Sequence, residues 1–294
     1  MSEKPKRVKT WMVVVGCLVV LAIIGSSIGK HEKTASEGQK GSAQAVGDTS
    51  QEGKTDQTKY DKKTIKFVQN SVIDDIINSV DGGDAILEKS KALQMLNISA
   101  AVDARRLAAD YAANEVAADQ KYKTKDGLLV SGVVDSISKD FTGSPYVVLR
   151  GNEMLQNVHA GFSRDSMNVL ASLQRGKKAT FVCRAGGYVA LQVALKNCAT
   201  PDAYGNDQKV RKPIDKAVSD VLSGKKTSDK DMAGMIATGV WMSNLLPNDS
   251  TCFMNVSGDE CKKQFTGIAK ASKKKPEAID SEIAAIEKDF LSNN

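Results

Sequence analysis

The chain has 294 residues, of which 41% are hydrophobic, so it is long enough for one or two domains with an ordinary core. It carries 41 lysines and arginines against 35 acidic residues, and this net charge of +6 is too small to indicate an anionic partner by itself. Only two histidines occur, and no glycine-rich phosphate loop, HExxH or GxSxG motif is present. The sequence therefore predicts a protein that is not an enzyme and has neither a metal site nor a cofactor.

The N-terminus has the pattern of a membrane anchor. A basic leader at residues 1–10 precedes an uncharged apolar run at residues 11–29, and a helix of about 20 apolar residues crosses a bilayer. Basic residues are denser before the run than after it, which predicts a cytoplasmic N-terminus and export of the chain beyond residue 30. A cleaved signal peptide is the alternative, with candidate cleavage sites around Gly25 to Ser27 or Ser27 to Gly29.

A flexible linker and a helical region follow the apolar run. Residues 30–63 hold almost no large aliphatic side chains, too few to offset the entropy cost of ordering the segment. From Thr64 onward, valines and isoleucines recur at helical spacing until DGGD at residues 81–84 ends the helix. The alanine-rich stretch that comes next extends the predicted helical region to residues 64–120, with a break near Asn97. Such apolar stripes are typical of core packing.

Residues 121–200 have the pattern of short strands around one helix. The predicted strands are residues 128–137, 145–149 and 157–162, then KKATFVC and GYVALQVAL around the turn RAGG, and the predicted helix is residues 166–176. Three strands, a helix and two strands is the order of an OB-fold, a five-stranded Greek-key barrel with a helix between strands three and four. Because the first strand of such a barrel bends to serve both halves, Gly132 is expected at its bend.

The C-terminal region, residues 201–294, is helical by pattern. Its interruptions are Gly224, Pro247 and Pro276, and Pro276 lies near the start of a terminal amphipathic helix. The predicted architecture is therefore α+β: an N-terminal transmembrane helix, a helical segment, a five-stranded OB barrel with a helix between strands 3 and 4, and C-terminal helices.

Four cysteines lie beyond the apolar run, an even number that fits two disulfides in an oxidising compartment. The short loop between Cys252 and Cys261 makes that pair the easiest closure, which leaves Cys183 with Cys198. If the hairpin turns around Gly186, however, Cys198 lies about nine residues out of register with Cys183, roughly 30 Å along the strand. A direct bond between them then requires a displaced turn or a strongly curved barrel. Four buried reduced thiols are the remaining alternative.

A set of motif residues runs from Tyr111 to Cys198 in a characteristic order. They are Tyr111, Asn114, Ala118, Asp119, Tyr122, Lys123, Val130, Gly132, Val134, Ile137, Leu173, Gly176, Cys183 and Cys198. Taken together, they resemble the tRNA-anticodon-like OB-fold family of bacterial membrane-anchored proteins and lipoproteins, mostly of unknown function. The resemblance implies an exported barrel on a tether, held at the bacterial inner membrane by residues 11–29. It does not imply RNA binding, because the family name records a likeness of fold.

The face of strands two and three is where OB barrels commonly bind oligonucleotides or sugars. Here the candidate residues of that face are Tyr146, Arg150, His159, Phe162 and Arg164. A nucleic-acid platform needs several stacked aromatic residues beside its positive charges, and this face offers few. The leading hypothesis is a non-enzymatic, membrane-tethered OB-fold protein of the bacterial envelope that binds a protein, an envelope component or a small ligand. The alternatives are a nucleic-acid-binding module at the cytoplasmic face of the membrane and an envelope hydrolase without a recognised motif.

Overall fold

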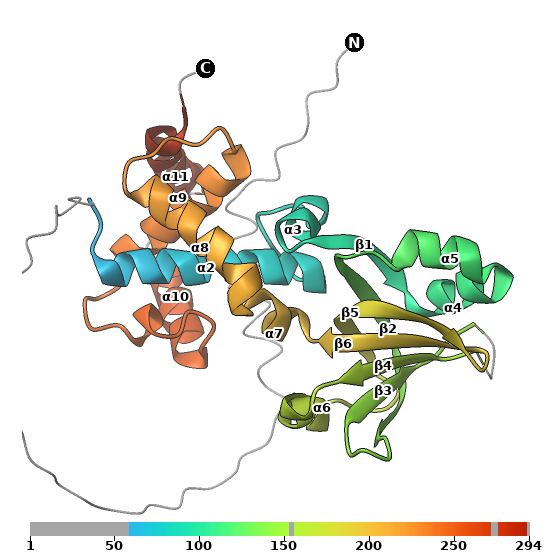
Figure 1. The fold of residues 1–294 in the computed structure, drawn as a ribbon. Helices are drawn as coiled ribbons and strands as arrows, with labels where there is room; N and C mark the ends of the chain where they lie inside the picture. Colours follow the sequence, from blue (N-terminus) through green and yellow to red (C-terminus); the bar gives the residue numbers. More distant parts are fainter. Residues whose placement is uncertain (1–58, 153–155, 272–275, 293–294) are drawn as a thin grey trace, which may run out of the picture.

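The computed structural model describes residues 59–152, 156–271 and 276–292, and its architecture is α+β (Figure 1). A β-barrel forms one end of the molecule and a group of helices forms the other. The predicted leader, the predicted anchor and all but the end of the predicted linker lie outside the described residues. Within the described residues, every helix is too short or too polar to cross a bilayer.

Helix α2, Lys62–Asp81, is the long central helix of the helical group. It begins where the side chain of Asp61 accepts a hydrogen bond from the backbone nitrogen of Thr64 at 2.7 Å, and it ends at Gly82, whose φ of 88° is left-handed. The predicted apolar stripe is confirmed, since these side chains form a buried face. Its members are Phe67, Val68, Val72, Ile73, Ile76, Ile77 and Val80.

The alanine-rich stretch after α2 departs from the predicted helix. Its elements are α3 (Lys89–Met95), β1 (Ile98–Asp103), α4 (Ala104–Ala113) and α5 (Glu115–Tyr122). The prediction of helix at residues 98–103 was wrong: β1 lies parallel to the start of β2 (Gly127–Lys139), and Asn97 turns the chain into it with a φ of 52°. Backbone hydrogen bonds to a neighbouring strand outweigh the helical preference of alanine, which amounts to a few tenths of a kcal/mol per residue.

Five strands close into a barrel in the order β2-β3-β4-β6-β5, and β5 pairs again with β2. The other strands are β3 (Pro145–Leu149), β4 (Val158–Phe162), β5 (Lys178–Val189) and β6 (Gln192–Ala199). Strands β4 and β6 are parallel, and the other neighbours within the barrel are antiparallel. A helical turn, η2 (Arg164–Ser166), and the short helix α6 (Met167–Ala171) lie between β4 and β5. This is the predicted OB-fold.

Strand β2 serves both halves of the barrel. Its residues Leu128 to Val133 pair with β5, and from Val134 onward it pairs with β3. Gly132 lies just before this change of partner. A Cβ atom at Gly132 would stand 2.7 Å from the Cβ of Ala104, so the absence of a side chain allows α4 to approach the strand closely.

Helices α4 and α5 pack into the core of the barrel through two buried tyrosines. The hydroxyl of Tyr111 donates to Asp119 at 3.0 Å, and that of Tyr122 donates to Asp110 at 2.6 Å. The ring of Tyr111 also stacks on Tyr122 and Tyr188, with centroids 6.2 and 5.9 Å away. Burial, and then the hydrogen bond to Asp119, raise the pKa of Tyr111, so the phenol stays protonated. These family-motif residues therefore join the helices to the barrel.

The β5–β6 hairpin turns at Ala190 and Leu191, both with positive φ, and the prediction of a turn around Gly186 was wrong. Because β5 continues beyond Gly186 and contains two register shifts, Cys183 lies beside Cys198 with a Cα–Cα distance of 4.1 Å. The two cysteines form a disulfide, and the predicted offset of nine residues does not occur.

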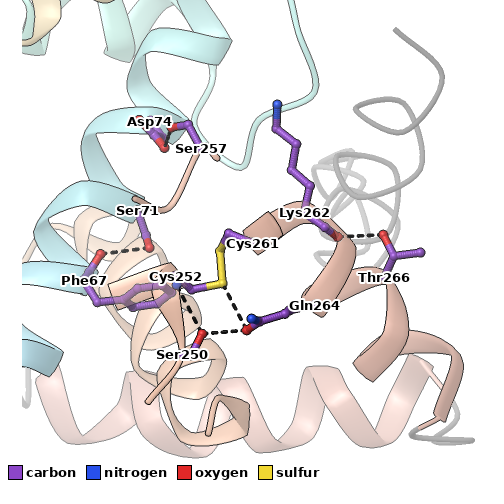
Figure 2. The surroundings of a disulfide bond; sticks show 10 residues. All are labelled: Phe67, Ser71, Asp74, Ser250, Cys252, Ser257, Cys261, Lys262, Gln264 and Thr266. Carbon is purple, nitrogen blue, oxygen red and sulfur yellow. Dashed lines mark hydrogen bonds between the residues drawn. A yellow bond between two sulfur atoms is a disulfide. The ribbon is translucent and has the colours of Figure 1, made fainter. Parts of the chain in front are cut away.

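The C-terminal helices pack around α2, and the first of them lies next to the barrel (Figure 1). They are α7 (Pro201–Gly205), α8 (Gln208–Leu222), α9 (Lys230–Leu245), η3 (Thr251–Phe253), α10 (Asp259–Ala271) and α11 (Pro276–Phe290). The predicted interruption at Gly224 is confirmed by its φ of 99°, and Pro276 is the first residue of α11. A buried disulfide between Cys252 and Cys261 closes the loop before α10 (Figure 2). Ile98 of β1 and the barrel residues Leu129 and Val182 belong to the same hydrophobic core as these helices.

Substituting Gly132→Ala is expected to lower the free energy of unfolding by about 1–3 kcal/mol, because the new methyl group forces α4 away from β2. Gly234→Ala in α9 is the matched control, since a Cβ atom there meets nothing within 4 Å and alanine stabilises a helix by about 0.5–1 kcal/mol. Urea denaturation of both variants measures the difference. Equal changes in the free energy of unfolding for the two substitutions would contradict the close approach of α4 to β2.

Four of the five cysteines are paired in two disulfides. Thiol titration of the oxidised, unfolded chain is therefore expected to detect one free thiol, that of Cys17. Replacing Cys183 and Cys198 together by alanine is expected to lower the free energy of unfolding by about 3 kcal/mol, the value for closing a loop of this size, which spans 15 residues. Thiol titration in denaturant and urea denaturation make the two measurements. Three or more free thiols in the oxidised protein would contradict the pairing.

Candidate functional site

The outer face of β3 and β4 carries a stacked pair of rings. Residues alternate across a strand, and Val147 on β3 and Ala160 on β4 point into the barrel core. Tyr146 and His159 therefore point outward, and their rings stack with centroids 5.7 Å apart and an interplanar angle of 14°. Both residues are half-buried, so part of the pair is exposed to solvent.

His159 is the ionisable member of this pair. Desolvation by its surroundings lowers the pKa of the imidazole from its ordinary value of 6.5. At neutral pH the ring is therefore uncharged, and it offers one donor nitrogen and one acceptor nitrogen. The face thus combines an aromatic stacking surface with neutral hydrogen-bonding groups.

A tightly bonded loop between β2 and β3 borders the pair. The carboxylate of Asp140 accepts hydrogen bonds from the backbone nitrogens of Thr142 and Ser144 and from the Thr142 hydroxyl. The Thr142 hydroxyl makes the largest contribution to lowering the pKa of Asp140, and Arg164 also contributes. The guanidinium of Arg164 donates to the carbonyl oxygen of Thr142. Phe141, inside this loop, is fully exposed.

Two of the predicted site residues lie elsewhere. Arg150 follows the opposite end of β3, where its guanidinium lies 3.3 Å from the carboxylate of Asp135. Phe162 is only 6% exposed and packs edge-to-face on Phe181, with centroids 4.9 Å apart, so it belongs to the barrel core. The structure thus brings Tyr146 and His159 into contact, places Arg164 near their end of the strands, and separates Arg150 and Phe162 from them.

Phe141 is a candidate that sequence reasoning missed. Its signal is a large aromatic residue within DFTGS, a turn otherwise made of small and polar residues. Among the described residues, no three histidine, cysteine or acidic side chains converge in a way that could hold a metal ion.

Comparison with known proteins supports the fold. A family model described as tRNA_anti-like matches residues 4–199, two thirds of the chain. The chain belongs to the tRNA_anti-like family. Neither the curated proteins nor the solved structures contain a match. The matched region contains the whole barrel and the α4–α5 pair, and an OB barrel of this kind is a binding fold.

Below pH 6.5, protonation of His159 is expected to cost stability, because the folded protein binds that proton more weakly than the unfolded chain does. The loss develops as the pH falls from 6.5 through the lowered folded pKa. In His159→Gln this contribution is absent, so the decrease in unfolding free energy between about pH 8 and about pH 5 should be smaller than in the wild type. Urea denaturation at both pH values measures this decrease in each protein. The same decrease in wild type and in His159→Gln would contradict a neutral, desolvated imidazole.

Proposed function

We propose that this protein is a membrane-tethered, non-catalytic OB-fold binding protein of the bacterial envelope. The observation that carries the proposal is the stacked pair of Tyr146 and His159 on the outer face of β3 and β4. This is the face through which OB barrels commonly engage oligomeric ligands. The barrel holds the pair in place from behind through Val147 and Ala160, so little conformational entropy is lost when a ligand binds.

The chemistry of the face suits a ring-bearing envelope molecule such as a sugar. The tyrosine ring offers a stacking surface, and the neutral imidazole donates or accepts hydrogen bonds to hydroxyl groups. Phe141 adds an exposed apolar side chain at one border, and Arg164 adds a positive charge. The charge of Arg164 also suits a weakly acidic group on such a ligand.

Three features support the proposed compartment. The basic leader and the apolar run at residues 11–29 have the pattern of a membrane anchor with an exported C-terminal part. The family match begins at residue 4, so that segment belongs to the matched region. Two disulfides, one in the barrel and one before α10, are typical of an oxidising space.

Fusion of a reporter that is active only outside the cytoplasm to the C-terminus tests the compartment. We expect reporter activity and a protein that stays in the membrane fraction, because residues 11–29 act as the anchor. Deleting residues 11–29 should abolish both. A fusion that is active only with a cytoplasmic reporter would overturn the envelope assignment.

Binding of envelope glycan fragments to the full-length protein in nanodiscs tests the face. Tyr146→Ala is expected to weaken binding about tenfold, because loss of one aromatic stacking partner costs about 1–3 kcal/mol. Val116→Ala removes an exposed apolar side chain from α5 and is the control, which should leave the affinity unchanged. Binding that is equally strong in Tyr146→Ala would exclude this face as the site.

A nucleic-acid-binding module at the cytoplasmic face of the membrane is the second candidate. Residues 121–198 carry 11 basic side chains against 5 acidic ones, a local excess of +6 that favours it. Against it, Arg150 is paired with Asp135, and few aromatic residues accompany the charges on the outer face. Salt-dependent binding of single-stranded oligonucleotides, weakened by Arg150→Ala and Arg164→Ala, would favour this candidate over the first.

A further inference from the structure

A large cavity lies between the barrel and the helical group. Its volume is about 1030 Å³, comparable with the largest pockets that hold small organic ligands. One wall is the side of α2 that includes Asp74 and Asn78, and the opposite wall is formed by β1, β2 and β5 around Leu129 and Thr180. It is a separate site, since neither Tyr146 nor any other residue of the stacked face contributes to its lining.

The inner surface of the cavity is apolar and adaptable. Helix α9 contributes Met235 and Met242, and helix α10 contributes Phe265. Methionine side chains are flexible and polarisable, so they fit ligands of different shape. On the barrel side, Leu129 continues this apolar surface. The interior therefore suits the hydrocarbon part of a ligand.

The charges around the cavity are opposite in sign to those of the whole protein. Its lining holds five aspartates and three lysines, a net charge of −2, whereas the chain carries +6. The lining residues are Asp74, Asp75, Asp81, Asp103 and Asp202 on the acidic side and Lys89, Lys178 and Lys262 on the basic side. Such a cavity attracts a cation.

Among the aspartates that line the cavity, Asp74 and Asp202 lie close enough to interact electrostatically. The carboxylate of Asp202 accepts one hydrogen bond, from the side-chain amide of Asn206 at 3.1 Å. Asp75 is engaged with the backbone, because its two oxygens accept hydrogen bonds from the amides of Ile86 and Leu87 at 2.8 and 3.0 Å. Asp74 has one partner in the cavity wall, the hydroxyl of Ser257 (Figure 2).

Charge repulsion links Asp74 to Asp202. Burial raises the pKa of Asp74, and the negative charge of Asp202 raises it further, whereas the hydrogen bond from Ser257 and the charges of Arg211 and Lys262 lower it. A cation between the two carboxylates would relieve both the desolvation and the repulsion.

The wall that carries Ser257 is held by a disulfide. Ser257 lies in the loop between Cys252 and Cys261, and both cysteines are buried beneath it (Figure 2). Just before this loop, the side chain of Ser250 accepts a hydrogen bond from the backbone nitrogen of Cys252 at 3.1 Å and donates one to the side chain of Gln264 at 2.6 Å. These bonds hold the polar end of the cavity in place.

We propose that this cavity binds a small organic cation, a protonated amine attached to an apolar chain or ring. The ammonium group lies between Asp74 and Asp202, and the apolar body lies against Met235, Met242 and Leu129. An organic cation fits better than a metal ion, because the acidic side chains of the described residues do not form a cluster that could hold a metal.

Phenethylamine is the probe, tested on the full-length protein in nanodiscs with empty nanodiscs subtracted. Methyl-labelled methionine NMR should show the signals of Met235 and Met242 shifting with the amine, and much smaller shifts with the neutral 2-phenylethanol and with 3-phenylpropionate. Asp74→Asn should weaken amine binding about tenfold, because it removes a charged partner of the ammonium and keeps an acceptor for Ser257. Asp165→Asn, at an exposed position that does not line the cavity, is the matched control.

Asp202→Asn repeats the test from the other carboxylate, so the result does not depend on the folding of one variant. Equal binding of the alcohol and the amine would overturn the proposal. The proposal would also be overturned if a folded Asp74→Asn or Asp202→Asn variant bound the amine with unchanged affinity. NMR shifts confined to methionines other than Met235 and Met242 would overturn it too. The reporter residues Met235 and Met242 line the cavity and lie apart from Tyr146 and His159, so this outcome is independent of the proposed function of the β3–β4 face.

Discussion

The change of partner along β2 is the constraint on which the structure depends. A closed barrel of five strands requires one strand to hydrogen-bond to β5 with its first half and to β3 with its second half. Near Gly132 this leaves one edge of the first half of β2 free, and β1 pairs with that edge. Helix α4 follows directly from β1 and crosses β2 where glycine leaves room for it. Strand β2 thus links the barrel to β1 and α4, while β5 and β6 contact the helical group through α7.

The two candidate sites lie on different outer surfaces of this barrel. On β3 and β4, the buried Val147 and Ala160 support the exposed pair of Tyr146 and His159. On β1, β2 and β5, the outer surface faces the helices and forms one wall of the large cavity. The disulfide Cys183–Cys198 joins the middle of β5 to the end of β6, and Cys252–Cys261 closes the loop before α10. One side of the barrel therefore carries the Tyr146–His159 pair, and another side forms a wall of the acidic cavity.

Local patterns in the sequence predict the features whose cause is local. The stripe on α2, the strand order around α6 and the start of α11 at Pro276 follow from periodicity, turn residues and proline chemistry. Of the candidate site, Tyr146 and His159 are recovered because strand alternation places them on one face. Phe162 was included wrongly, because the same alternation along β4 places it on the core side with Val158 and Ala160, opposite His159.

By itself the sequence determined the α+β class, the OB order of strands and helix, and the residue types of a binding face, because these depend on spacing and composition along the chain. Only the tertiary structure decided that residues 98–103 form β1, since a strand at an edge exists only where a partner strand has a free edge. It also decided the pairing of Cys183 with Cys198, since two bulges and a turn at Ala190 set the register. The cavity has the same origin, because its walls come from segments more than 100 residues apart in the chain, such as Asp74 and Asp202.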